Sequence, residues 1–154
     1  MAVFFLDTSA IVNRYVQETG TAWVQALTAP TVGNSHFLAR ITLPETIAAI
    51  TRRERGGQIA AADAVTALTD FQYDFARQYR CVEITPGLIA QAAVLARTYA
   101  LRGYDAVQLA AALEADRTHQ AAGLGSVTLV SSDYELNTAA AAAGMVVDDP
   151  NSHP

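Results

Sequence analysis

The chain begins Met1-Ala-Val-Phe-Phe-Leu-Asp-Thr-Ser-Ala-Ile-Val-Asn-Arg14, and this segment sets the pattern for everything that follows. Val3 to Leu6 is a run of strand-forming residues, and apolar residues recur at helical spacing after Asp7, which predicts a buried strand followed directly by a helix. The carboxyl ends of strands face the binding crevice of an open α/β sheet, so Asp7 is the first candidate for a functional residue. A purely structural role, as the cap of the helix, is an equally good interpretation at this point.

The rest of the chain repeats the alternation of short apolar strands and longer amphipathic segments. This alternation predicts a three-layer α/β/α fold with a central parallel sheet of about five strands. No linker or tandem repeat divides the chain, so we expect one domain over residues 1–148 and a loose C-terminal tail at 149–154. The expected strands are 3–6, 35–41, 81–84, 127–130 and 145–147, and the expected helices after the first are 21–27, 42–55, 59–80, 86–102, 104–123 and 134–143.

The composition is that of a globular chain, since 51% of its 154 residues are hydrophobic and 16% are charged. No apolar run approaches the ~20 residues of a membrane span, so we expect a cytoplasmic protein without a membrane partner. The net charge of −5 argues against a broad basic surface for nucleic acids, but it leaves room for a nucleic-acid substrate held locally. All ten basic residues are arginines, which excludes mechanisms that need a lysine. The single cysteine, Cys81, is expected to be a core residue.

Four acidic residues stand at boundaries between the expected elements. Asp7 and Asp133 each follow a strand, and Glu45 and Asp105 each lie in the first turn of a helix. Such positions can converge on one crevice of a parallel sheet. Each acid alone also has a structural explanation, and for Glu45 a capping box with Thr42 is the favoured one.

Three arginines, Arg52, Arg53 and Arg55, crowd the end of the helix that contains Glu45. Cations suit the carboxyl end of a helix dipole. A solvated helix end is therefore at least as good an interpretation as contact with RNA.

If the four acids converge, their mutual repulsion requires a cation. Oxygen ligands without a nearby thiol or imidazole suit Mg²⁺ or Mn²⁺ rather than zinc. The three histidines are isolated and fit no ligand spacing. A carboxylate-bound Mg²⁺ activates water and stabilises the charge that builds on a phosphate, so phosphodiester hydrolysis is the reaction that such a site serves best.

Four short segments, spread in order over nearly the whole chain, carry a family resemblance. They are Phe5-Leu6-Asp7-Thr8-Ser9-Ala10, Pro44-Glu45, Arg102-Gly103-Tyr104-Asp105-Ala106-Val107-Gln108-Leu109-Ala110, and Ser131-Ser132-Asp133 followed by a helix and Gly144. In these segments the chain resembles the PIN-domain nucleases, and among them the VapC-like toxins of type II toxin–antitoxin systems. Where that family often has Thr-x-Asp, this chain has serine in place of threonine, which keeps the hydroxyl.

The resemblance implies a five-stranded parallel sheet and a Mg²⁺-dependent endoribonuclease whose site is built from the four acids. Asp7 and Asp105 would hold the metal most directly, and the other two would complete its ligand shell or position water. Ser9 and Ser131 match small hydroxyl residues that orient the carboxylates. The resemblance further implies a homodimer and a cognate antitoxin, whose C-terminal segment would block the crevice.

Two other functions stay open. An aspartyl-phosphate phosphatase is suggested by Asp7 after the first strand, but Ser9 stands where a second aspartate is usual, and the chain has no lysine to steady a phosphate. A catalytically inactive binding module of the same fold, acting only through a protein partner, is the alternative from another class.

Overall fold

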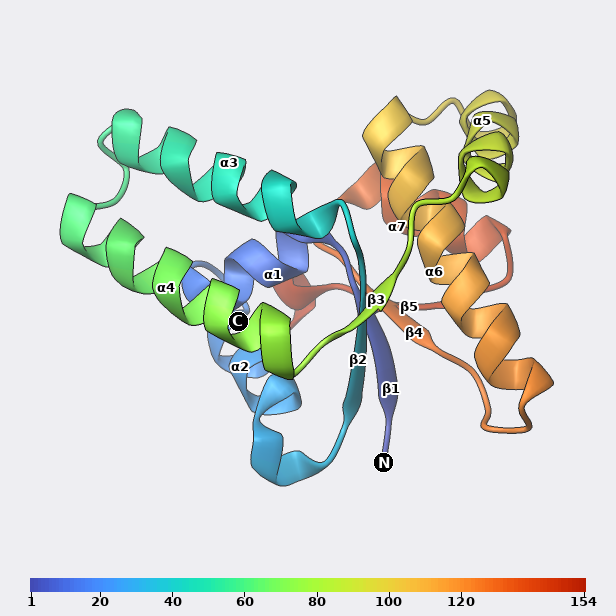
Figure 1. The fold of residues 1–154 in the computed structure, drawn as a ribbon, viewed down its shortest axis with the longest axis horizontal. Coiled ribbons are helices and arrows are strands. Elements are labelled where there is room, and N and C mark those ends of the chain that lie inside the picture. Colours follow the sequence, from blue (N-terminus) through green and yellow to red (C-terminus); the bar gives the residue numbers. More distant parts are fainter.

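A computed structural model describes all 154 residues and shows a five-stranded sheet between two layers of helices (Figure 1). Every neighbouring pair of strands is parallel, in the order β3-β2-β1-β4-β5. The strands are β1 (Val3–Leu6), β2 (Ser35–Ala39), β3 (Arg80–Val82), β4 (Thr128–Val130) and β5 (Val146–Asp148). The predicted three-layer α/β/α architecture is confirmed.

Seven helices cover the sheet (Figure 1). One layer contains α1 (Thr8–Tyr15), α2 (Thr21–Thr28), α3 (Thr42–Arg55) and α4 (Ala61–Arg77), and the other contains α5 (Pro86–Tyr99), α6 (Gly103–Ala121) and α7 (Tyr134–Ala142). The hairpin of α3 and α4 projects beyond the sheet, and α3 packs on α1 and α4. None of the helices combines the length and apolar character needed to cross a membrane.

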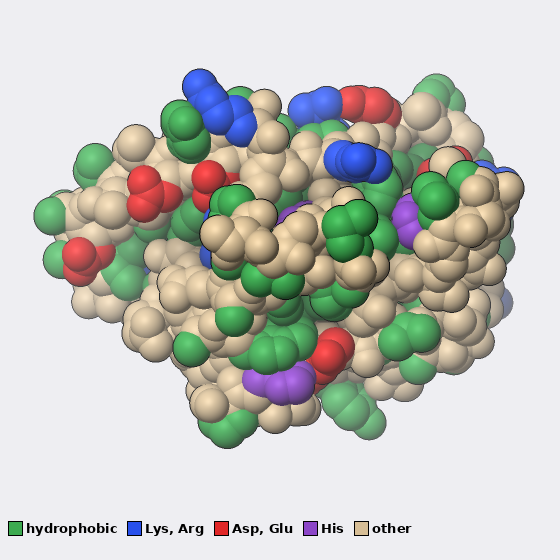
Figure 2. All heavy atoms as spheres, turned by 90° about the horizontal axis from the view of Figure 1, so that it is seen from below, with side chains coloured by type: hydrophobic (Ala, Val, Ile, Leu, Met, Phe, Trp, Pro, Cys, Tyr) green, Lys and Arg blue, Asp and Glu red, His purple; other side chains and the backbone are tan.

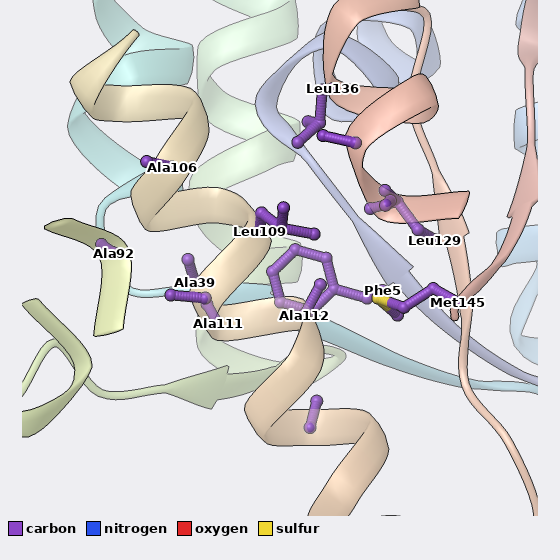
Figure 3. Packing of buried hydrophobic residues seen from close by; sticks show 14 of the residues in the cluster. Phe5, Ala39, Ala92, Ala106, Leu109, Ala111, Ala112, Leu129, Leu136 and Met145 are labelled. Atoms are coloured by element: carbon purple, nitrogen blue, oxygen red, sulfur yellow. The ribbon is translucent and has the colours of Figure 1, made fainter. Parts of the chain in front are cut away.

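The strands send successive side chains to opposite faces, which builds one core under each helical layer. Phe5 joins the core beneath α5, α6 and α7, and Leu6 joins the core beneath α1, α2 and α4. Figure 3 shows the ring of Phe5 beside Leu109 and Ala112 of α6. The buried face of α6 is rich in alanine, and these small side chains let the helix approach the sheet closely.

The topology places a crevice beside the central strand β1. The chain first adds β2 and β3 on one side of β1, and then adds β4 and β5 on the other. The order of strands therefore reverses between β1 and β4, which is where α/β sheets bind ligands. The backbone N–H of Asp7 donates to the carbonyl of Val130 at 3.2 Å and holds the two strand ends together.

The C-terminal segment differs from its sequence expectation. Residues 149–154, expected as a loose tail, carry a short 3-10 turn at Pro150–Ser152, and the ring of His153 stacks on Trp23 with 4.1 Å between the ring centroids. Gly20 permits this packing, because its φ of 84° is left-handed and a Cβ there would collide with the carbonyl that begins the turn. An aromatic partner on α2, distant in sequence, orders this segment.

Candidate active site

Asp7 lies where β1 ends and α1 begins, and only 4% of its surface is exposed. Its Oδ1 accepts hydrogen bonds from the backbone N–H of Ala10 at 3.0 Å and from the hydroxyl of Ser9 at 2.6 Å. Its Oδ2 accepts one from the hydroxyl of Ser131 at 2.8 Å. The two interpretations of Asp7 are thus compatible, because one oxygen caps the helix while the residue also lines a cleft.

Ser9 and Ser131 both direct their hydroxyl protons at Asp7. The backbone N–H of Ser132 donates to the Ser9 oxygen at 2.9 Å, and the backbone N–H of Asp133 donates to the Ser131 oxygen at 3.0 Å. A hydroxyl has a single proton, and the backbone donors occupy lone pairs, so each proton is left for the carboxylate. In this geometry the two serines orient Asp7.

The other two aspartates differ in how firmly they are held. Asp133 follows β4 and caps α7, because its Oδ1 accepts a hydrogen bond from the backbone N–H of Leu136 at 2.9 Å. Asp105 lies in the first turn of α6 and is only 6% exposed, yet no hydrogen bond steadies its carboxylate. Only Asp133 is fixed by its helix.

Glu45 corrects one sequence prediction. The capping box with Thr42 does not form, since the N-cap residue of α3 is Ile41 and no side chain caps this helix. The Thr42 hydroxyl instead accepts a hydrogen bond from Nε2 of Gln108 at 3.0 Å, and Oε2 of Glu45 accepts one from the hydroxyl of Thr8 at 2.8 Å. Glu45 therefore turns toward α1, and its Oε1 is buried without a partner.

Gln108 is a residue of the site that the sequence analysis did not single out. It is 2% exposed, and its Nε2 donates to the hydroxyl of Thr8 at 3.1 Å as well as to Thr42. Since Thr8 in turn donates to Glu45, Gln108 links α6 to the carboxylate carried by α3. The available signal was a lone amide within the apolar run Ala106-Val107-Gln108-Leu109-Ala110.

All four predicted acids line one cleft of about 620 Å³. As the side chains stand, no three acidic, histidine or cysteine side chains are close enough together to hold a metal ion. The structure thus brings the four acids to one cleft without a completed metal centre. A larger groove of about 840 Å³ between α1, α2 and α4 contains none of them. The other polar residues that line the cleft are Thr8, Ser9, Glu18, Arg52, Arg53, Tyr104, Gln108 and Ser132.

Comparison with known proteins assigns the chain to a family. No protein-family model matches it. It is 33% identical over 144 residues to Ribonuclease VapC45 of Mycobacterium tuberculosis, across 94% of this chain and 93% of that protein. Ribonuclease VapC49 of a second strain of the same species aligns to the same extent. The chain belongs to the VapC ribonuclease family.

Solved structures of VapC and VapBC proteins share the fold. VapC20 of Mycobacterium tuberculosis, described as a sarcin-ricin loop cleaving toxin, matches with a TM-score of 0.59 and 20% identity, over 98% of this chain and 99% of that one. VapBC2 of Rickettsia felis, bound to a promoter DNA fragment, matches with a TM-score of 0.60 and 12% identity, over 96% of this chain and 98% of that one. At these identities the likeness shows a common PIN-like fold.

Burial and mutual repulsion raise the pKa of several acids in this VapC-family cleft. Burial, the largest cause, raises the pKa of Asp7 to about 6 against the lowering effect of the hydrogen bonds that it accepts. Burial also raises the pKa of Asp105 to about 6, and the charges of Asp133 and Asp7 add to this effect. The pKa of Glu45 is raised, again chiefly by burial. None of the four acids forms a salt bridge, so the chain itself supplies no paired cation.

The donor atoms of this VapC-family cleft fit a hard divalent cation. No histidine or cysteine lines it, so carboxylate oxygens are the available charged ligands, and these suit Mg²⁺ or Mn²⁺. Glu45 Oε1 has no partner, and the Asp105 carboxylate is not held by a hydrogen bond, so both can turn toward an ion. The histidines are engaged elsewhere with Leu27, Gly125 and Asp148.

Proposed function

We propose that the chain is a metal-dependent endoribonuclease and the toxin of a toxin–antitoxin pair. The observation that carries this proposal is the set of four carboxylates that line one cleft without a paired cation. Mutual repulsion within such a set favours the binding of a divalent ion. Membership of the VapC family supports RNA as the substrate, since the aligned relatives are named ribonucleases.

In this mechanism Asp7 and Asp105 would hold Mg²⁺, or Mn²⁺ in its place, and Glu45 and Asp133 would contribute further ligands or position the attacking water. When bound, the ion supplies a Lewis acid for the phosphate and lowers the pKa of water. The two serines keep the oxygens of Asp7 oriented, and Gln108 holds Glu45 through a threonine hydroxyl. Hydrolysis adds one water across a P–O bond of RNA, and the leaving oxygen takes up a proton.

A cognate antitoxin is the protein partner in this proposal. Two of the solved proteins that share the fold are VapBC2 of Rickettsia felis and a toxin–antitoxin complex from Klebsiella pneumoniae. The net charge of −5 favours a partner segment that carries basic residues. A homodimer is a further part of the proposal and rests on the family resemblance alone.

Substitution of the two proposed metal ligands tests the enzyme assignment. Asp7→Asn or Asp105→Asn removes a ligand charge, so we expect each to reduce Mg²⁺-dependent RNA cleavage by more than the roughly 10–100-fold typical of groups that only orient a ligand. Asp63→Asn, at an exposed acid of α4 outside the cleft, is the matched control. Undiminished cleavage by both cleft variants, with folding verified by circular dichroism, would reject the assignment.

A metal titration separates the enzyme from an inactive binding module. A protein that binds Mg²⁺ only when folded gains about 2.7 kcal/mol of stability at a free ion concentration 100 times the Kd. We therefore expect Mg²⁺ and Mn²⁺ to raise the melting temperature of the wild type, and to raise that of Asp105→Asn less. A melting temperature that does not respond to either ion, together with absent cleavage, would favour the binding module.

A further inference from the structure

Few cations of this chain are free to meet an anionic ligand. Four of the ten arginines form ion pairs with acids, and these are Arg14, Arg40, Arg53 and Arg117. On the face shown in Figure 2 the basic side chains are scattered and form no continuous patch. Of the six arginines outside ion pairs, only Arg52 lines the cleft of the four acids, and it is exposed.

Arg52 lies on the same face of α3 as Glu45. The two residues are seven positions apart, which is nearly two helical turns and about 10 Å along the helix axis. Ala48 and Ala49 line the cleft between them, and their small side chains leave the path along α3 open. Arg53, the neighbouring cation, is held by Glu18 at 2.5 Å, so Arg52 is the arginine of this helix face that remains available.

An aromatic side chain also lines the cleft, from the first turn of α6. Tyr104 directly precedes Asp105 at the start of α6 and is 49% exposed. Its hydroxyl accepts a hydrogen bond from Arg102 at 2.8 Å, which steadies the ring while leaving it accessible to the cleft. Exposed aromatic rings are stacking surfaces for unpaired bases, whereas bases within a duplex are stacked on each other.

We infer that Arg52 and Tyr104 position the RNA in the cleft, so that an unpaired stretch of the strand runs from one residue to the other across the four acids. The Arg52 guanidinium binds a backbone phosphate at one end, and the Tyr104 ring stacks on a base at the other. The inference rests on the proposed ribonuclease function and adds two residues that position the substrate. It also explains how an acidic chain holds RNA, because Arg52, with the exposed Arg102 beside Tyr104, supplies local attraction where the acids of the cleft repel phosphate.

Equilibrium binding of a short fluorescent single-stranded oligoribonucleotide tests the inference. All proteins carry Asp7→Asn so that the RNA stays intact, and anisotropy is measured with Mg²⁺ present over a range of salt concentrations. Arg52→Ala is expected to weaken binding and to reduce the slope of log K against log salt by about 0.7, the contribution of one phosphate contact to a single strand. Arg55→Ala, at an exposed arginine of the same helix end outside the cleft, is the matched control and is expected to leave the slope unchanged.

Tyr104 is tested by a different readout. Tyr104→Ala is expected to weaken binding roughly fivefold or more without changing the salt slope, because stacking releases no counterions. Tyr104→Phe keeps the ring and is expected to restore binding. A duplex of the same sequence is expected to bind more weakly than the single strand. Equal salt slopes for Arg52→Ala and Arg55→Ala, equal affinity of Tyr104→Ala and its parent, or preference for the duplex would each overturn the inference.

The two proposals can fail separately. If the wild type cleaves RNA while Arg52→Ala and Tyr104→Ala bind as their parent does, the path across the cleft is wrong and the ribonuclease proposal stands. If the wild type cleaves no RNA with Mg²⁺ or Mn²⁺ while both variants lose affinity as expected, the ribonuclease proposal is wrong and the binding path stands.

Discussion

The two sides of the cleft are built in different ways. On the strand side, Asp7 and Asp133 follow β1 and β4, and backbone N–H groups and serine hydroxyls hold their oxygens. On the helix side, Glu45 and Asp105 project from α3 and α6, with one unpartnered oxygen on Glu45 and no hydrogen bond to Asp105. The strand side is thus fixed by the fold, whereas the helix side keeps oxygens that can turn toward a ligand. A cleft of this kind combines rigid and adjustable carboxylates.

Among residues that only support the four acids, the largest loss of cleavage is expected when the strand side is loosened. Ser131→Ala removes a donor to Asp7 and the acceptor of the Asp133 N–H, so we expect a roughly 10–100-fold loss of RNA cleavage. The free energy of unfolding should fall by about 1–3 kcal/mol, because buried groups lose their partners. Cleavage rates and urea unfolding measure the two effects. Ser132→Ala is the control, since the Ser132 hydroxyl has no partner to lose. Equal losses in both variants would mean that the strand side is not fixed by Ser131.

A smaller loss of RNA cleavage is expected from a change on the helix side. Gln108→Met replaces the amide with an apolar side chain of similar size and removes the donor to Thr8 and Thr42, so we expect a loss of cleavage of roughly tenfold. The loss should depend on Glu45, because Gln108 acts on that carboxylate through the Thr8 hydroxyl. A double-mutant cycle with Glu45→Gln measures this coupling. Additive losses in the double variant would show that Gln108 does not position Glu45.

The pH dependence of stability tests one acid from each side of the cleft, Asp7 on the strand side and Asp105 on the helix side. The folded-state pKa of Asp7 and Asp105 is raised from 3.8 to about 6, so the folded state binds more protons than the unfolded state in that window. Stability therefore falls as the pH rises from about 4 to about 6, by at most about 1.4 kcal/mol per pH unit for each group. Asp7→Asn and Asp105→Asn should each flatten this fall. Thermal melts in EDTA at several pH values measure it, and unchanged profiles in both variants would contradict the raised pKa values.

The smallest effect, a change in stability without a change in cleavage, is expected at Ala100, where α5 leads into α6, the helix that carries Asp105. Ala100 has a φ of 53°, in the left-handed region that favours glycine. We expect Ala100→Gly to raise the free energy of unfolding by about 1 kcal/mol and the melting temperature by about 2–4 °C, with unchanged cleavage. Ala93→Gly, on an exposed face inside α5, is the control and should lower the melting temperature instead. A fall in both variants would show that residue 100 is not strained.

The sequence predicted the fold and the location of the four acids better than it predicted the hydrogen bonds of the site residues. Strand and helix positions follow from local periodicity, so the parallel sheet and the acids at its carboxyl edge could be read directly. The predicted capping box of Thr42 and Glu45 does not form, because the Thr42 hydroxyl accepts a hydrogen bond from Gln108, which is 66 positions away in the sequence. Gln108 itself was missed because its hydrogen-bond partners come from other helices. The stacking of His153 on Trp23 could not be predicted either, because the two residues lie far apart in the sequence.

By itself the sequence determined that strands and helices alternate and that four acids stand at their ends, because caps, turns and apolar spacing act over a few neighbouring residues. Only the tertiary structure decided which carboxylate oxygens are held and which are free. The hydrogen bonds that hold these oxygens join residues far apart in the sequence. Thr8 and Glu45 are 37 positions apart, and Asp7 and Ser131 are 124 positions apart. A hydroxyl proton goes to the best acceptor that folding brings near it, and that competition cannot be seen in a linear pattern.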